Sequence, residues 1–330
     1  MLLLAKSILG LTLGFVLAIV IGLVLIPMLR KLNARQTVSE FINKRHLKKN
    51  GTPTMGGIIF IVPPLIGITI LILLGKLELN SNLVILIFTF VAYAFLGFID
   101  DYMKVVKHNN KGLSIKIKFV FQLLIALVFY IIYTKNGGSS NLQISLFKIN
   151  IPLGWGYMVF ILFLLVGTTN AVNITDGLDG LCGGLSIMSF LAYGVIAWGS
   201  SWIAGYDSIA IFSFMLIGGI IGFLLFNVAP ARVFMGDTGS LALGGALATI
   251  AVLTHHEISL AIIGGVFVIE TLSSLIQIIA ITKFNKKVFL KAPLHHHFEE
   301  LGWEEPDIVK VFWVIGFLLA MFGVVYGVWL

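Results

Sequence analysis

Few residues of this chain carry a charge. Only 11% of its 330 residues are Asp, Glu, Lys or Arg, whereas a soluble domain usually has about a quarter. Hydrophobic residues make up 58% of the chain, and the mean hydropathy is +1.04. A water-soluble fold of this length cannot bury so much apolar surface, so a lipid bilayer is the expected solvent.

Cysteines and repeats are also scarce. The single cysteine, Cys182, excludes an internal disulfide framework, and its apolar neighbours indicate a packing residue. The first apolar run continues to Met28 without a small-residue cleavage pattern, which predicts a retained span rather than a cleaved signal peptide. No internal repeat is visible, so the inverted-repeat architecture of many transporters gains no support.

Ten apolar segments are each near the ~20 residues that a helix needs to cross a bilayer. They are residues 3–28, 56–75, 82–99, 117–134, 152–170, 181–199, 208–228, 240–256, 258–282 and 309–329. The sequence therefore predicts an all-α polytopic integral membrane protein with about ten transmembrane helices in a single domain, 1–330. It also predicts a short outer β-hairpin near 140–151 and a bend at Gly264-Gly265 in the ninth segment.

The basic residues predict the orientation. Eighteen of the 22 Lys and Arg side chains lie in alternate loops, starting with the loop after the first segment. The positive-inside rule places these loops in the cytoplasm and both termini outside, in a periplasmic or extracellular location. Eleven of the fifteen acidic residues lie on the same side although acids do not follow that rule, which indicates a site there. The net charge of +7 suits headgroups and phosphates and does not indicate nucleic-acid binding.

Carboxylates mark two of the inner loops. Asp100-Asp101 closes the third segment, where the pair is either functional or an acidic marker of the membrane interface. In Asn173–Gly180, Asp176 and Asp179 would share a helical face, which favours a site over a simple turn.

A third carboxylate follows the seventh segment. Asp237 lies between two glycines, and a lone carboxylate with open surroundings suits Mg²⁺, although it would also serve as a helix N-cap. Phe234 could stack on a nucleotide base. Lys104 and Lys116 either hold phosphate oxygens or only orient the chain.

Two further polar strings lack this acidic character. His295, His296 and His297 are adjacent and should splay apart, which disfavours a zinc site and leaves them free to donate to phosphate oxygens. Thr52–Gly57 opens the second segment, where it is either an anion site or a plain entry turn. All five strings fall in inner loops, and together they describe a metal-assisted phosphoryl-transfer site.

At these strings the chain resembles the phospho-N-acetylmuramoyl-pentapeptide-transferases, which belong to the polyprenyl-phosphate N-acetylhexosamine-1-phosphate transferases. The resemblance covers nearly the whole chain and rests on Thr52–Gly57, Asp100-Asp101, Asn173–Gly180, Phe234–Ser240 and Pro293–Glu299, in that order. It implies a Mg²⁺-dependent, multi-pass enzyme of the bacterial cytoplasmic (inner) membrane that acts in peptidoglycan synthesis. UDP-N-acetylmuramoyl-pentapeptide and undecaprenyl phosphate would give lipid I and UMP on the cytoplasmic face. Contact with membrane lipids and a homodimer are also implied.

The resemblance also implies roles for single residues. Asp237 is the expected magnesium ligand, and Asp100, with Asp101 beside it, is the expected base or orienter of the lipid phosphate. Lys116, Asn173 and His295–His297 complete the expected catalytic set. The expected substrate-binding residues are Lys49, Thr54, Lys104, Asp176, Gly177, Leu178, Asp179, Asn227, Phe234 and Gln277. Direct transfer and a two-step route through a phosphoryl-aspartate both fit the sequence.

Two alternatives differ in function. A GlcNAc-1-phosphate transferase of the same superfamily would share the inner-face strings. A metal transporter would use the histidines, and it predicts polar residues at mid-bilayer and on both faces. In this sequence only Glu270 and Gln277 lie deep within a segment.

Overall fold

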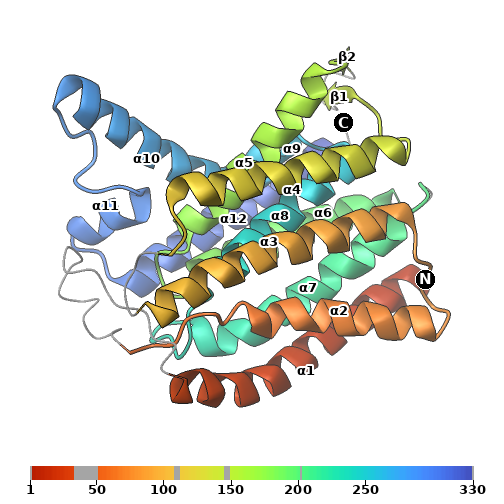
Figure 1. Cartoon of the computed structure of the whole chain (residues 1–330), viewed down its shortest axis with the longest axis horizontal. Helices are drawn as coiled ribbons and strands as arrows, with labels where there is room; N and C mark the ends of the chain where they lie inside the picture. The colour runs from red at the N-terminus through yellow and green to blue at the C-terminus, as the bar shows by residue number, and fades with distance from the viewer. Residues whose placement is uncertain (1, 33–50, 108–111, 145–148, 201–202, 329–330) are drawn as a thin grey trace.

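The computed structural model describes the chain except for residues 1, 33–50, 108–111, 145–148, 201–202 and 329–330. Its elements form a helical bundle with one small hairpin (Figure 1). They are α1 (Leu2–Lys31), α2 (Ile58–Leu73), α3 (Ser81–Val106), α4 (Ile115–Lys135), β1 (Asn141–Ile144), β2 (Ile149–Pro152), α5 (Gly156–Thr175), α6 (Leu181–Gly199), α7 (Tyr206–Asn227), α8 (Gly236–Leu253), α9 (Ser259–Ile263), α10 (Gly265–Phe284), α11 (Leu294–Glu300) and α12 (Glu305–Val328).

The predicted helical membrane architecture is confirmed. Nine helices among the described residues are long and apolar enough to cross a membrane. The predicted second span is the shorter α2, whose 16 residues measure about 24 Å at 1.5 Å per residue. The predicted ninth span bends as expected, because the helix is interrupted at Gly264 and continues as α10. The predicted hairpin is also present, with Asn141 opposite Pro152 and Ile144 opposite Ile149.

The centre of the bundle is formed by α7 and α8. In the most apolar 18-residue stretch of each helix, 78% of the residues of α7 and 89% of those of α8 are buried. The corresponding shares are 22% for α1 and 17% for α4. A helix that is apolar on every side is buried among other helices or faces lipid, and α7 and α8 are of the first kind. Small residues let those neighbours come close: a Cβ at Gly244 of α8 would lie 2.6 Å from the Thr169 Cα of α5. The outer helices instead expose apolar side chains, as expected for lipid contact.

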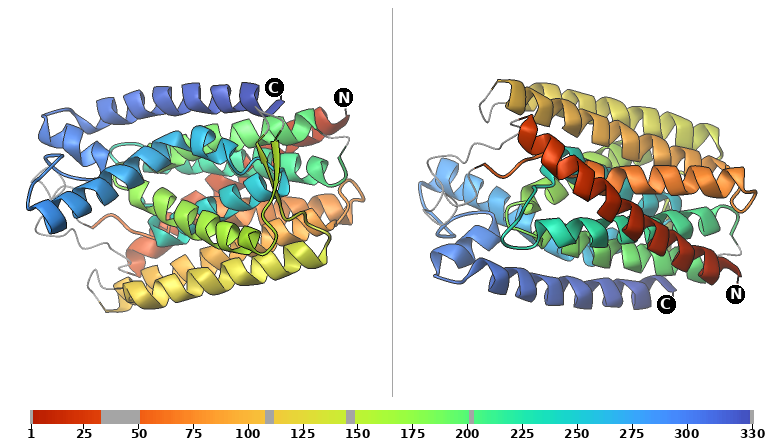
Figure 2. Two further views of the ribbon diagram at one scale, coloured as in Figure 1. Left: turned by 90° about the horizontal axis from the view of Figure 1, so that it is seen from above. Right: turned by 90° about the horizontal axis from the view of Figure 1, so that it is seen from below.

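The ends of the helices place the polar strings. Because α3 and α8 run antiparallel side by side, the C-terminal half of α3 meets the N-terminus of α8. The loops that enter α6 and α12 and the short helix α11 lie at this same end (Figure 1). The first turn of α1 and the last turn of α12 lie together at the other end (Figure 2).

Candidate active site

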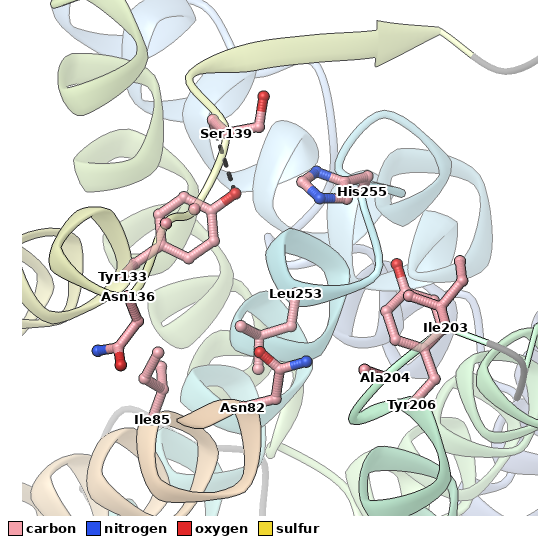
Figure 3. A pocket seen from close by; sticks show the side chains of 12 residues that line it. Asn82, Ile85, Tyr133, Asn136, Ser139, Ile203, Ala204, Tyr206, Leu253 and His255 are labelled. Carbon is pink, nitrogen blue, oxygen red and sulfur yellow. Dashed lines mark hydrogen bonds between the residues drawn. The ribbon is translucent and has the colours of Figure 1, made fainter. Parts of the chain in front are cut away.

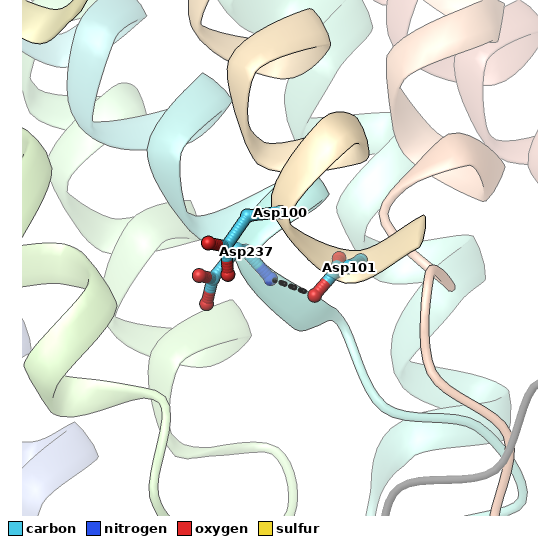
Figure 4. A group of neighbouring side chains, drawn as sticks. All are labelled: Asp100, Asp101 and Asp237. Atoms are coloured by element: carbon cyan, nitrogen blue, oxygen red, sulfur yellow. Dashed lines mark hydrogen bonds between the residues drawn. The ribbon is translucent and has the colours of Figure 1, made fainter. Parts of the chain in front are cut away.

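Three carboxylates converge where α3 meets α8 (Figure 4). Ligand oxygens of Asp100, Asp101 and Asp237 all lie within 4.8 Å of one another. The backbones of the two helices touch here, because a Cβ at Gly97 would lie 2.1 Å from the Asp237 carbonyl oxygen. Among the described residues no other group of three or more His, Cys, Asp or Glu side chains could hold a metal ion. The cluster is therefore the candidate metal centre.

The two neighbouring aspartates of α3 do different work. Asp101 is buried, and its carboxylate accepts hydrogen bonds from the backbone N–H of Asp237 at 3.2 Å and from the N–H and hydroxyl of Thr238 at 2.9 and 2.7 Å. Unpaired N–H groups at a helix N-terminus favour a negative charge. Asp101 therefore holds the start of α8, whereas Asp100 accepts from the Leu113 N–H at 2.7 Å.

Two lysines balance much of this negative charge. Lys104 Nζ lies 2.6 Å from Asp100 Oδ2 and 3.0 Å from Asp237 Oδ2. Lys118 Nζ lies 2.7 Å from Asp237 Oδ2. Three carboxylates and two ammonium groups thus form one contiguous cluster, which joins cations suited to phosphate oxygens to carboxylates suited to a metal ion.

The Asn173–Gly180 string joins this cluster to the rest of the site. Asn173 at the end of α5 donates from Nδ2 to Asp237 Oδ1 and to Ser240 Oγ, both at 2.8 Å. Asp179 Oδ2 accepts from the Ala231 N–H at 2.9 Å. The Gly180 N–H donates to Asn227 Oδ1 at 3.0 Å. The predicted residues Asp179 and Asn227 therefore fix the loop after α5 and the loop after α7 against each other.

The Thr52–Gly57 string packs on the loop that precedes α8. The Phe234 N–H donates to the Pro53 carbonyl, and the Gly56 N–H donates to the Phe234 carbonyl, both at 2.8 Å. Thr54 is buried, and a Cβ at Gly236 would lie 2.7 Å from its hydroxyl. Phe234 itself stays partly exposed, as a side chain that stacks on a base must be.

The three histidines point to three different partners. His295 Nδ1 lies 2.8 Å from Glu270 Oε2, and His296 Nδ1 lies 2.6 Å from Glu299 Oε2. His297 Nδ1 accepts from the Leu290 N–H at 3.2 Å. Burial lowers the pKa of His296, and hydrogen bonding to Glu299 opposes that shift. The ring centroids of His295 and His296 nevertheless lie only 4.2 Å apart, so the prediction that adjacent histidines splay apart is wrong for this pair.

The histidines nevertheless belong to the site. A Cβ at Gly177 would lie 2.3 Å from His295 Nε2, so the α11 histidine touches the same string that contacts Asp237 through Asn173. Four of the predicted strings are therefore joined by direct contacts around the N-terminus of α8, and the fifth is linked to them through Gly177.

A separate pocket lies at the opposite end of the bundle (Figure 3). It has a volume of about 260 Å³ and is lined by the start of α3, the end of α4 and the residues after α8, among them Asn82, Tyr133 and His255. Ile85 of its lining and Asp100 are 15 residues apart on one helix, or about 22 Å. None of the predicted catalytic residues borders it.

The sequence matches two family models that cover this region. Glycosyl transferase family 4 matches residues 83–255, and phospho-N-acetylmuramoyl-pentapeptide-transferase signature 1 matches residues 49–61. A phospho-N-acetylmuramoyl-pentapeptide-transferase of Bacillus velezensis is 48% identical over 318 residues, covering 96% of both chains. Enzymes of the same name from Bacillus subtilis and Geobacillus sp. are each 47% identical, covering 96% and 98% of both chains. The chain belongs to this family. The resemblance seen in the sequence is thereby confirmed.

In this member of the transferase family, the lysine that contacts the carboxylate cluster from α4 is Lys118 and not the predicted Lys116. Lys116 is exposed on α4 and makes none of the contacts of the carboxylate cluster, whereas Lys118 contacts Asp237 directly. The spacing of residues along the α4 helix could have identified Lys118 as the lysine that faces the bundle. Gln122 is buried and lies four residues after Lys118 on the same face, whereas a residue two positions away faces elsewhere.

The structure describes only one of two further predicted substrate-binding residues, Lys49 and Gln277. Lys49 lies outside the described residues. Gln277 of α10 donates from Nε2 to the Phe289 carbonyl at 2.9 Å and accepts from the N–H groups of Val288 and Phe289 at 3.0 and 2.9 Å. All of these partners are in the loop to α11, so Gln277 fixes that loop.

Proposed function

We propose that the chain transfers phospho-N-acetylmuramoyl-pentapeptide from UDP to undecaprenyl phosphate, giving lipid I and UMP. Curated relatives that match almost the whole chain bear the name of this transferase. The observation that carries the proposal is the mixed cluster of Asp100, Asp237, Lys104 and Lys118, because a transfer between two phosphates needs both cation-binding and anion-binding groups.

The reaction brings one anion to another. A phosphate oxygen of the lipid must approach a diphosphate, so positive groups have to offset their repulsion. Lys104 and Lys118 are in place for this task, and each is a point charge that can follow a phosphate oxygen. A phosphate monoester has a second pKa of about 6, so the lipid phosphate needs little deprotonation at neutral pH. Asp100 therefore need not act as a base, and it would orient the attacking phosphate through Lys104, whose Nζ lies 2.6 Å from Asp100 Oδ2.

The donor set of this site fits Mg²⁺. This ion prefers carboxylate oxygens and completes its octahedral shell with water and substrate phosphates. Asp237 and Asp100 would hold it, because both contact the mobile side chain of Lys104, which an ion could displace, whereas Asp101 is held by the first residues of α8. When bound, the ion would neutralise charge on the diphosphate. Asn173 orients the Asp237 carboxylate through a hydrogen bond of 2.8 Å.

We further propose that the single domain lies in the bacterial inner membrane, with ten crossings, both termini outside and the site in the cytoplasm. The excess of lysine and arginine in alternate loops supports this orientation. The polar strings and the chain termini also occupy opposite ends of the bundle. The homodimer implied by the resemblance stays a prediction, which native mass spectrometry of the purified protein tests.

The test is a transfer assay with the full chain purified in detergent. Labelled UDP-N-acetylmuramoyl-pentapeptide and undecaprenyl phosphate should give lipid I and UMP in the presence of Mg²⁺ and neither product with EDTA. UDP-GlcNAc in place of the first donor should give no lipid product. Equal turnover of UDP-GlcNAc would favour the related GlcNAc-1-phosphate transferase. Zinc uptake by proteoliposomes without any UMP release would favour a transporter.

A further inference from the structure

A buried carboxylate of α10 lies outside the carboxylate cluster but contacts the histidine string. Glu270 is completely buried in the membrane-spanning part of the helix. Its Oε1 accepts from the His295 N–H at 3.1 Å, and its Oε2 lies 2.8 Å from His295 Nδ1. One carboxylate thus contacts both the backbone and the ring of the same residue. This double contact fixes the position of α11 and the rotation of the imidazole.

The contact with Nδ1 also decides which ring nitrogen remains available. A carboxylate accepts hydrogen bonds, so Nδ1 carries the proton and Nε2 is the nitrogen that faces away. His295 is buried, and its Nε2 has no hydrogen-bond partner in the structure. Buried polar atoms are almost always paired, and an unpaired one in a candidate active site indicates a position that a ligand completes.

The surroundings of Nε2 show which segment this atom faces. The atom points at Gly177, where a Cβ would come within 2.3 Å of it. Gly177 is four residues after Asn173, which donates to Asp237. Only a residue without a side chain leaves room for the imidazole against this segment. Nε2 therefore faces the string that borders the carboxylate cluster.

We propose that Glu270 is a positioning residue, which holds the His295 ring so that Nε2 can accept a hydrogen bond from a hydroxyl group of the bound nucleotide substrate. This inference rests on the proposed function. Glu270 itself touches no substrate, and it acts through His295 alone. A merely structural role would instead make Glu270 equally important whether or not the imidazole is present.

A double-mutant cycle separates these two roles. The variants are Glu270→Gln, His295→Asn and the double variant, all measured as full chains in the same detergent. Glu270→Gln keeps the size of the side chain and one acceptor oxygen, so it leaves the backbone contact possible but removes the second acceptor. Glu257→Gln is the matched control, because Glu257 is also a buried carboxylate with a side-chain hydrogen bond, to Tyr157, at the other end of the bundle.

Glu270→Gln should lower kcat by about 10- to 100-fold with a smaller change in KM, as loss of a group that orients a functional histidine does elsewhere. In the His295→Asn background the same change should lower kcat by less than about twofold, because coupled residues are not additive. Glu257→Gln should keep the kcat of the unchanged protein at pH 7.5. An equal loss from Glu270→Gln in both backgrounds would overturn the proposal.

A spectroscopic measurement keeps the inference separate from the reaction. ¹⁵N spectra of protein labelled at its seven histidines report which ring nitrogen is protonated, and the His295 signals are those lost in His295→Asn. The unchanged protein should show His295 protonated at Nδ1, and Glu270→Gln should shift that resonance. Nδ1 protonation without any transferase activity would refute the proposed function alone. Transferase activity with His295 protonated only at Nε2 would refute the role of Glu270.

Discussion

Lys116 and Lys118 offer a matched test of the active-site geometry. The two lysines are two residues apart on α4, but Lys118 contacts Asp237 at 2.7 Å whereas Lys116 is exposed. Replacing each by glutamine removes the same charge from the same helix. We expect Lys118→Gln to lose most turnover and Lys116→Gln to keep it within about twofold, since an exposed charge contributes little.

The magnitude follows from the burial of the ion pair. The side chains of Lys118 and Asp237 are 16% and 15% exposed, so the site is partly desolvated. Unit charges about 4 Å apart interact by about 4 kcal/mol at an effective dielectric constant near 20, and residual solvent reduces this toward about 2 kcal/mol. If Lys118 contributes that energy to the charge of the transition state, its loss lowers kcat by about 30- to 900-fold.

The assay measures UMP release at saturating lipid phosphate over a range of Mg²⁺ concentrations. Lys118→Gln leaves three carboxylates with one lysine, so the half-saturating Mg²⁺ concentration should fall even as kcat drops. Lys118→Arg should restore part of kcat because it restores the charge. A kcat for Lys118→Gln within threefold of that of the unchanged protein, or a larger loss for Lys116→Gln, would refute the reasoning.

The neighbouring aspartates of α3 should separate stability from turnover. Asp101→Asn places an amide against the Thr238 donors and should cost about 1–3 kcal/mol, seen as a lower Tm in detergent, whereas Asp100→Asn should lose most activity at an unchanged Tm. At the end of the bundle away from the carboxylate cluster, burial raises the pKa of Glu257 from its ordinary 4.5 to about 7. The folded protein then holds a proton that the unfolded chain has released, so stability falls as pH rises from about 4.5 to 7, by up to about 3 kcal/mol. Burial lowers the pKa of His255 and His256, which changes stability in the opposite direction below pH 6.5. Tm is therefore compared between pH 6.5 and 8, where the last part of the Glu257 effect, about 0.8 kcal/mol, remains. Glu257→Gln should flatten this fall; an unchanged slope contradicts the assignment.

The sequence predicted the membrane class and the grouping of the polar strings because both follow from composition. Long apolar runs need lipid, and the distribution of charge between loops separates the two faces. The individual role of each side chain was less accessible. Adjacent aspartates on a helix diverge by about 100°, but their different partners are set by how α8 enters the bundle. Asp101 caps that helix and Asp100 does not.

Glu270 and Gln277 illustrate the same limit. The sequence shows only that both lie deep within an apolar segment, and the structure shows that both are buried. Their partners lie in α11 and the loop before it, up to 25 residues further along the chain. No local pattern encodes a contact across that distance, since it depends on the loop folding back along α10.

The contact at Gly97 has a consequence for how the metal site keeps its dimensions. The backbone of α3 at Gly97 contacts the backbone of α8 at Asp237. The distance between the carboxylates on these two helices is therefore set mainly by the main chains. A single methyl group at Gly97 would push the helices apart without touching any charge. The spacing of the proposed metal ligands therefore depends on an apolar residue.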